Sequence, residues 1–173
     1  VRHCQPRNPI HGLSVVPPRS ALWVDWQGRR FAPPLVTGFD TRDLVTRVCA
    51  TERQYSWQIL NRRIALKELA VSGAEIKPSI RDKKKLAFLR DLLFGNRWLV
   101  DTLVEKCEDV VVADTLPALV DKMNALQGDH AVDLEALGEA ISRYAAQIAR
   151  GPAHFEDEQL KRLALLRQWK GAR

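Results

Sequence analysis

The pattern of apolar and polar positions predicts a short β-rich front followed by a mostly helical back. Residues 21–25 and 29–31 have β-favouring composition and flank Gly28, which predicts a β-hairpin. Pro33 and Pro34 should end the second strand, because neither can donate to a β-ladder. Residues 1–20 contain four prolines and are expected to be irregular.

Candidate cap residues mark several helices. Asp40 or Thr41 is expected to begin a short helix that ends near Cys49. Residues 55–60 could form a strand, or could open a helical run to Ala70. A further helix is expected from Pro78 to just before Gly95, and another begins after a cap at Asn96. Two more helices are expected, one after Asp114 or Thr115 and one from Asp133 to Gly151. The last helix should run from the acidic residues 156–158 to about Trp169.

Three apolar patterns refine this interpretation. The helix after Asn96 should bury one side, and residues 110–112 should form a short strand. The helix after Asp133 is the most clearly amphipathic, and its apolar stripe consists of Leu134, Leu137, Ile141, Tyr144, Ala145 and Ile148. We therefore expect a single α+β domain over residues 1–173, with a β-hairpin-rich N-terminal part packed on a helical bundle.

Charge is divided unevenly along the 173 residues. Residues 1–100 hold 18 basic and 8 acidic side chains, a net +10, whereas residues 101–173 hold 9 and 13, a net −4. The front half should therefore attract anions such as nucleic acid, a phosphate or a carboxylate. No stretch reaches the ~20 apolar residues of a transmembrane helix. The three cysteines are too scattered for a disulfide framework or a zinc site, which favours a reducing, cytoplasmic compartment.

Few motifs point to chemistry. The nine glycines form neither GxGxxG nor GxxxxGK, so no phosphate-binding loop is encoded. The four histidines are scattered, and no metal ligands are predicted. The basic run around Lys83–Lys85 is the best nucleic-acid candidate, or else a solvated helix face. Residues 37–43 could form an anion clamp from helix-start amides and Arg42, or simply a cap with an Arg42–Asp43 ion pair.

Three ordered stretches resemble one flavoprotein family. Residues 22–31 are similar to its "hydrophobic-V-N/D-x-x-G-x-R-F" hairpin, and Thr41-Arg42-Asp43 follows with an aromatic stretch at 55–61. Residues 113–116 are similar to its "ADT-L" element. The family comprises the flavoprotein subunits of fumarate reductases and succinate dehydrogenases together with 3-ketosteroid dehydrogenases. The chain looks closest to bacterial FAD-binding dehydrogenases.

The resemblance implies that this chain is the central capping, or substrate, domain of a longer flavoenzyme, in keeping with its start at Val1. Residues 1–20 would lead in from the missing flavin-binding domain. FAD would belong to the full-length protein, and this fragment alone should bind none and be inactive. The implied reaction moves a hydride between flavin and a carbon adjacent to a carbonyl, making or reducing a C=C bond.

The resemblance also implies site residues. Arg42 matches a catalytic arginine that donates a proton and polarises the substrate, Thr41 and Asp43 would orient it, and His3 lies near the place of a substrate-binding histidine. Ala32-Pro33-Pro34 replaces the family's Asn-Glu, and no Glu-Arg proton relay is evident at residues 14–19. These departures argue against a small dicarboxylate substrate and leave an apolar, ketone-bearing one open. Ketosteroid dehydrogenases, however, usually have a tyrosine near the place of Arg42.

The expected partner is therefore a carbonyl-bearing small molecule rather than nucleic acid or a membrane. The alternative, based on the +10 front half, is a basic α+β binding module for an anionic partner such as nucleic acid.

Overall fold

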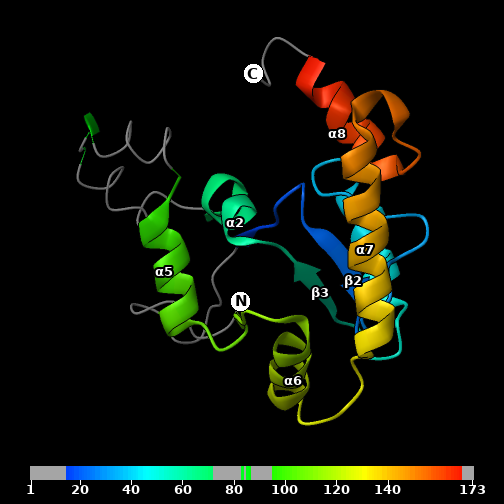
Figure 1. Ribbon diagram of the computed structural model, residues 1–173. Helices are drawn as coiled ribbons and strands as arrows, with labels where there is room; N and C mark the ends of the chain where they lie inside the picture. The colour runs from blue at the N-terminus through cyan, green and yellow to red at the C-terminus, as the bar shows by residue number, and fades with distance from the viewer. Residues whose placement is uncertain (1–14, 72–82, 84, 87–94, 169–173) are drawn as a thin grey trace. The chain divides into compact units, whose positions relative to one another are not determined.

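The computed structural model describes residues 15–71, 83, 85, 86 and 95–168 (Figure 1). Contacts divide the chain into two compact units. Unit 1 comprises residues 1–18 and 60–127, and unit 2 comprises residues 19–59 and 128–173. Each unit combines helices with one two-stranded antiparallel sheet, which confirms a mixture of α and β structure. A single capping domain over residues 1–173 stays a prediction.

The sheet of unit 2 pairs β2 (Leu22–Asp25) with β3 (Ser56–Ile59), as Figure 1 shows. The register places Leu22 opposite Ile59, and the Trp23 indole N–H donates to the Ser56 hydroxyl at 2.7 Å. Residues 55–60 therefore include a strand, and the helix begins only after it. Val24 of β2 is fully buried, so this short sheet contributes directly to the core.

The predicted turn at Gly28 forms, but the hairpin is shorter than expected. One carboxylate oxygen of Asp25 accepts hydrogen bonds from the amides of Gln27 and Arg29, each at 2.9 Å. Gly28 has φ +85°, a conformation that glycine adopts at little cost. The returning chain makes one isolated bridge, between Val24 and Arg30, and β3 supplies the longer partner of β2.

The turn packs on the start of α7 (Leu134–Arg150). Asp133 caps this helix as predicted, accepting from the amides of Glu135 and Ala136, while its own amide donates to the Gln27 carbonyl at 3.0 Å. A Cβ at Gly28 would lie 3.2 Å from the Leu137 Cβ, so glycine also permits this close approach.

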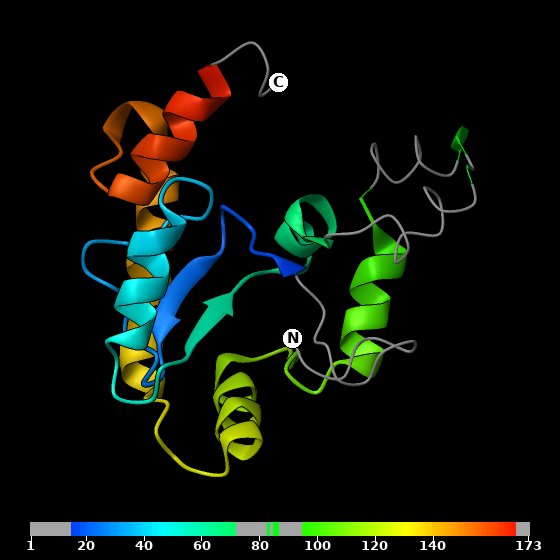
Figure 2. The same cartoon turned by 180° about the vertical axis from the view of Figure 1, so that it is seen from behind.

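The predicted apolar stripe of α7 is wider than the face that is buried. Leu137, Ala140 and Tyr144 are buried, whereas Leu134 and Ile148 are 43% and 51% exposed. The helix ends at Gly151 as expected, and η2 (Pro152–His154) leads into α8 (Glu158–Gln168), the red helix of Figure 2.

Arg30 lies at the centre of a polar network inside unit 2. Its guanidinium forms an ion pair with Asp157 and donates to the Gln159 side chain at 3.0 Å. It also lies 5.0 Å from the centroid of the Tyr144 ring. Gln159 is 1% exposed and donates in turn to the carbonyls of Arg19 and Ala21 at 2.8 and 2.9 Å. The network thus joins the hairpin, the chain before β2, α7 and α8.

Replacing Asp157 with asparagine should measure how much this ion pair contributes to the free energy of unfolding. The Asp157 side chain also accepts from the Leu160 amide at 3.1 Å, an interaction that asparagine retains. The two charged side chains are only 18% and 8% exposed, so Arg30 would lose its counter-charge in a largely dry setting. We expect Asp157→Asn to reduce the free energy of unfolding by about 3 kcal/mol, measured by chemical denaturation.

Glu139→Gln is the matched control, because it removes an exposed Glu139–Arg143 pair on α7. We expect a loss of at most about 0.5 kcal/mol. Equal losses in the two variants would contradict the structural importance of the Arg30 network.

Unit 1 contains a sheet that the sequence did not predict. β1 (Val15–Val16) pairs antiparallel with β4 (Ala70–Val71). Residues 1–20 were expected to be irregular, which is wrong at Val15 and Val16 because a distant strand supplies their hydrogen bonds. The same pairing ends the helical run early, so α2 spans Arg62–Glu68 and does not reach Ala70.

Asn96 caps α5 (Arg97–Lys106) as predicted, accepting from the Leu99 amide at 3.1 Å. α5 lies beside α2 (Figure 2). The buried side of α5 contributes to an apolar cluster that consists of Leu99, Leu103 and Cys107. Leu69 and Val110 pack against this cluster. The helix expected between Pro78 and Gly95 lies largely outside the described residues.

Two predictions for the end of unit 1 are wrong. Residues 110–112 do not form a strand. None of the strands among the described residues pairs with them, and the Val112 carbonyl accepts instead from the Lys122 ammonium at 2.6 Å, on α6 (Leu116–Gln127). Cys107 is disulfide-bonded, although the spacing of the cysteines gave no reason to expect a disulfide, while Cys49 is a free, exposed thiol.

Gly95→Ala should strongly destabilise the chain. Gly95 has φ +90°, and a Cβ there would lie 2.5 Å from the Leu66 carbonyl oxygen, which also accepts from the Asn96 amide. Both strain and collision oppose a side chain, so we expect a loss of about 2–4 kcal/mol in the free energy of unfolding.

Gly128→Ala separates these two causes. Gly128 has φ +74° with nothing within 4 Å of the added Cβ, so backbone strain of about 1 kcal/mol remains. A Gly95→Ala loss no larger than that of Gly128→Ala would contradict the collision with Leu66.

Candidate functional site

The strongest candidate from the sequence, Arg42, lies in the first turn of α1 (Thr41–Cys49). Asp40 caps this helix, as one of the two predicted caps, and its carboxylate accepts from the Asp43 amide at 2.9 Å. Gly38, with φ +85°, permits the turn that precedes the cap. The local sequence therefore fixes the residue at which α1 begins, and it places Arg42 in the first turn.

Thr41, Arg42 and Asp43 are all exposed. Consecutive helix residues point in different directions, so these three side chains do not converge on one point. Asp43 forms its ion pair with Arg47, at 3.6 Å, rather than with Arg42. The orienting role of Thr41 and Asp43 stays a prediction, and His3 lies outside the described residues.

Exposed apolar side chains flank Arg42. Phe39, just before the cap, is 44% exposed, and Val45, one helical turn beyond Arg42, is 51% exposed. The Arg162 guanidinium of α8 lies 5.4 Å from the centroid of the Phe39 ring. A guanidinium bordered by apolar surface suits the oxygen of a molecule that is otherwise apolar, because Arg can donate two parallel hydrogen bonds while the neighbours cover hydrocarbon.

Sequence reasoning missed Arg47, which is the best-anchored side chain of α1. It is 21% exposed, donates to the Pro33 carbonyl and lies 5.8 Å from the centroid of the Phe31 ring. The Asp43–Arg47 spacing of four residues could have predicted the ion pair. Nothing in the sequence could have predicted the contacts with Phe31 and Pro33.

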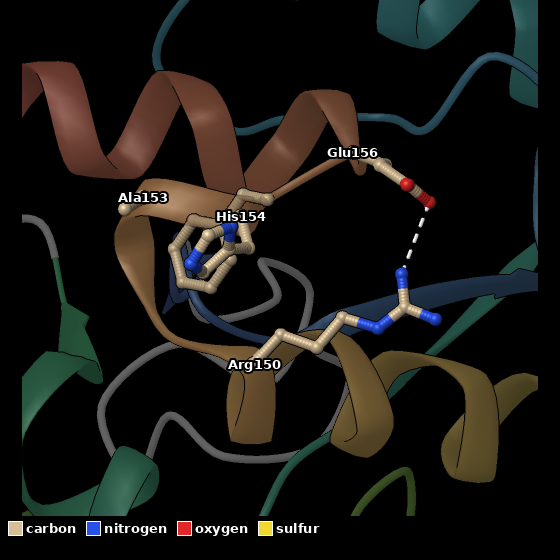
Figure 3. A pocket seen from close by; sticks show the side chains of 5 residues that line it. Arg150, Ala153, His154 and Glu156 are labelled. Carbon is tan, nitrogen blue, oxygen red and sulfur yellow. Dashed lines mark hydrogen bonds and ion pairs between the residues drawn. The ribbon is translucent and has the colours of Figure 1, made fainter.

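A shallow, wide-open hollow lies where α7 passes into η2 (Figure 3). It is lined by Arg150, Ala153, His154, Phe155 and Glu156. Arg150 and Glu156 point toward one another and form an ion pair at 3.2 Å, so their charges offset each other. The hollow contains no pairing of a nucleophile with a base, and we assign no chemistry to it.

Two kinds of site are not seen, a phosphate-binding glycine loop in the sequence and a metal centre among the described residues. The full sequence contains no glycine-rich phosphate loop. Within residues 15–71 and 95–168, no three metal-ligating side chains gather. The helices described there are all too short or too polar to cross a membrane.

Within unit 2, two basic residues of the front half form ion pairs with acidic residues of the back half. Arg30 pairs with Asp157, and Arg53 pairs with Asp129 while lying 4.6 Å from the Trp26 ring centroid. Of the predicted basic run, Lys83 and Lys85 are exposed, whereas most of the run lies outside the described residues.

Comparison with known proteins identifies relatives over nearly the whole chain. It is 30% identical over 166 residues to a KsdD-like steroid dehydrogenase of Mycobacterium tuberculosis, and 30% identical over 165 residues to a KsdD-like steroid dehydrogenase of Mycolicibacterium smegmatis. Each alignment covers 95% of this chain but only 29% and 30%, respectively, of those proteins. No family model matches, and no solved structure matches.

The chain thus spans less than a third of the length of the curated relatives it matches. Their names agree with the ketosteroid-dehydrogenase branch of the resemblance given by the hairpin, Thr41-Arg42-Asp43 and ADT-L stretches. They support a dehydrogenase-type relationship, and they do not by themselves assign a role to this segment.

Proposed function

We propose that this chain is the substrate-capping segment of a longer FAD-dependent dehydrogenase that acts on an apolar, ketone-bearing molecule of the steroid class. The observation that carries the proposal is the match of 95% of the chain to 29% of relatives named KsdD-like steroid dehydrogenases. Because the sequence encodes no phosphate-binding glycine loop, the remaining length of such an enzyme would hold the flavin.

Arg42 is the catalytic residue of this proposal. Its exposed guanidinium would donate hydrogen bonds to the substrate carbonyl oxygen. A base supplied by the rest of the enzyme would take the proton from the carbon beside the carbonyl. The negative charge that this leaves on the carbonyl oxygen would be stabilised by a pre-positioned cation. Phe39 and Val45, both exposed, would cover apolar substrate surface next to it. Closing the segment over the substrate would exclude water and strengthen these interactions.

The test uses the full-length protein that contains this chain. We expect a bound flavin, seen in the visible absorption spectrum, and reduction of an electron-accepting dye when a 3-ketosteroid is added. Arg42→Ala should lower kcat/KM about 100- to 1,000-fold while the flavin stays bound. Near-normal turnover in this variant would reject Arg42 as the catalytic residue.

Arg143→Ala is the matched control for Arg42→Ala. Arg143 is also an exposed helical arginine of unit 2, with a side chain 78% exposed and paired with Glu139. Its loss should leave kcat/KM within about twofold of the unaltered protein, since exposed pairs contribute little. A full-length protein without flavin and without ketosteroid turnover would reject the proposed function as a whole.

The alternative of a basic module for nucleic acid is tested separately. Because Arg30 and Arg53 are paired within unit 2, we expect no gel retardation of mixed oligonucleotides at physiological salt. A shift that weakens steeply as salt rises would instead favour the alternative, because phosphate contacts release counterions.

A further inference from the structure

Helix α1 has two dissimilar faces. Leu44, Arg47 and Val48 are half-buried and recur at the spacing of one helical side. Arg42, Val45 and Thr46 share the same spacing and are all exposed. Arg42 and Arg47 are therefore roughly 140° apart around the helix axis, so that one faces inward and the other outward.

The inward face combines half-buried apolar residues with the polar contacts of Arg47. No side chain of α1 is fully buried. Arg47 contacts three groups: the Pro33 carbonyl, the Phe31 ring at 5.8 Å and the Asp43 carboxylate at 3.6 Å. Two of these belong to the segment that follows the hairpin. Arg47 therefore ties the helix that bears Arg42 to the chain that leaves the Gly28 turn.

This arginine differs from an ordinary surface arginine of the same fold. Arg143 of α7 makes an ion pair of the same spacing with Glu139, but its side chain is 78% exposed. The Arg47 side chain is 21% exposed and meets a backbone carbonyl and an aromatic ring as well. A planar guanidinium satisfies all three contacts at once, whereas a lysine ammonium is a point charge that cannot stack.

We infer that Arg47 is a positioning residue: it fixes the orientation of α1 and so holds Arg42 where it meets the substrate. The inference rests on the proposed function for its catalytic consequence. The resemblance implied that Thr41 and Asp43 orient Arg42; this inference adds Arg47 to that role, with Asp43 as one of its contacts. Misplacing a reacting group by about 1 Å can lower a rate about 100-fold, so a loosened α1 should affect turnover.

The test compares Arg47→Lys with Arg143→Lys in the full-length protein. We expect Arg47→Lys to lower kcat about 10- to 100-fold, with the KM for a 3-ketosteroid within about threefold and the flavin spectrum unchanged. Amide hydrogen exchange of Leu44 and Val45 should accelerate, while exchange in β2 stays as in the unaltered protein. Arg143→Lys should change none of these quantities.

The outcomes separate the inference from the proposed function. A full-length protein that turns over no ketosteroid rejects the proposed function. Hydrogen exchange in that protein still tests whether Arg47 anchors α1. Unchanged exchange across α1 in Arg47→Lys overturns the inference whether or not the protein is active. Faster exchange with unaltered kcat in an active protein overturns it too, because α1 would then be anchored by Arg47 without any effect on Arg42.

Discussion

The ion pair between Arg30 and Asp157 is the interaction on which unit 2 depends. Its partners are 127 residues apart, and its supporting contacts with Tyr144 and Gln159 draw in α7 and α8. Most of the buried apolar residues of the described chain, among them Val24 and Leu137, belong to unit 2, and the network adds buried polar contacts between the same elements. The network works because most of its groups are satisfied, and a partly satisfied one would cost stability.

Two ion pairs of unit 2 join the basic front half of the sequence to its acidic back half. Taken along the chain, a +10 front half resembles an anion-binding surface. In the folded unit, basic residues of the front half meet acidic residues of the back half, as Arg30 meets Asp157 and Arg53 meets Asp129. The charge asymmetry then promotes pairing of distant segments. Arg42, by contrast, is exposed at the start of α1.

Features decided within a few residues could be predicted from the sequence, and features decided at long range could not. The caps at Asp40, Asn96 and Asp133 are local hydrogen bonds and were found. The strand expected at residues 110–112 does not form, and no strand in the described part of the chain pairs with these residues. β1 was missed because its partner is β4, far along the chain. For the candidate site, the position of Arg42 followed from its cap, whereas the contacts of Arg47 with Phe31 and Pro33 depend on tertiary packing.

Unit 2 is assembled from two separated pieces of chain, and the contacts of Arg53 with Asp129 and of Gln27 with Asp133 bring parts of the first piece beside the start of the second. The intervening residues 60–127 form unit 1 together with residues 1–18, through the pairing of β1 with β4. A chain cut after residue 127 would hold all of unit 1 but would lack the second piece of unit 2, including the Asp157 partner of Arg30. Unit 2, which contains the helix bearing Arg42, therefore requires both of its pieces of chain.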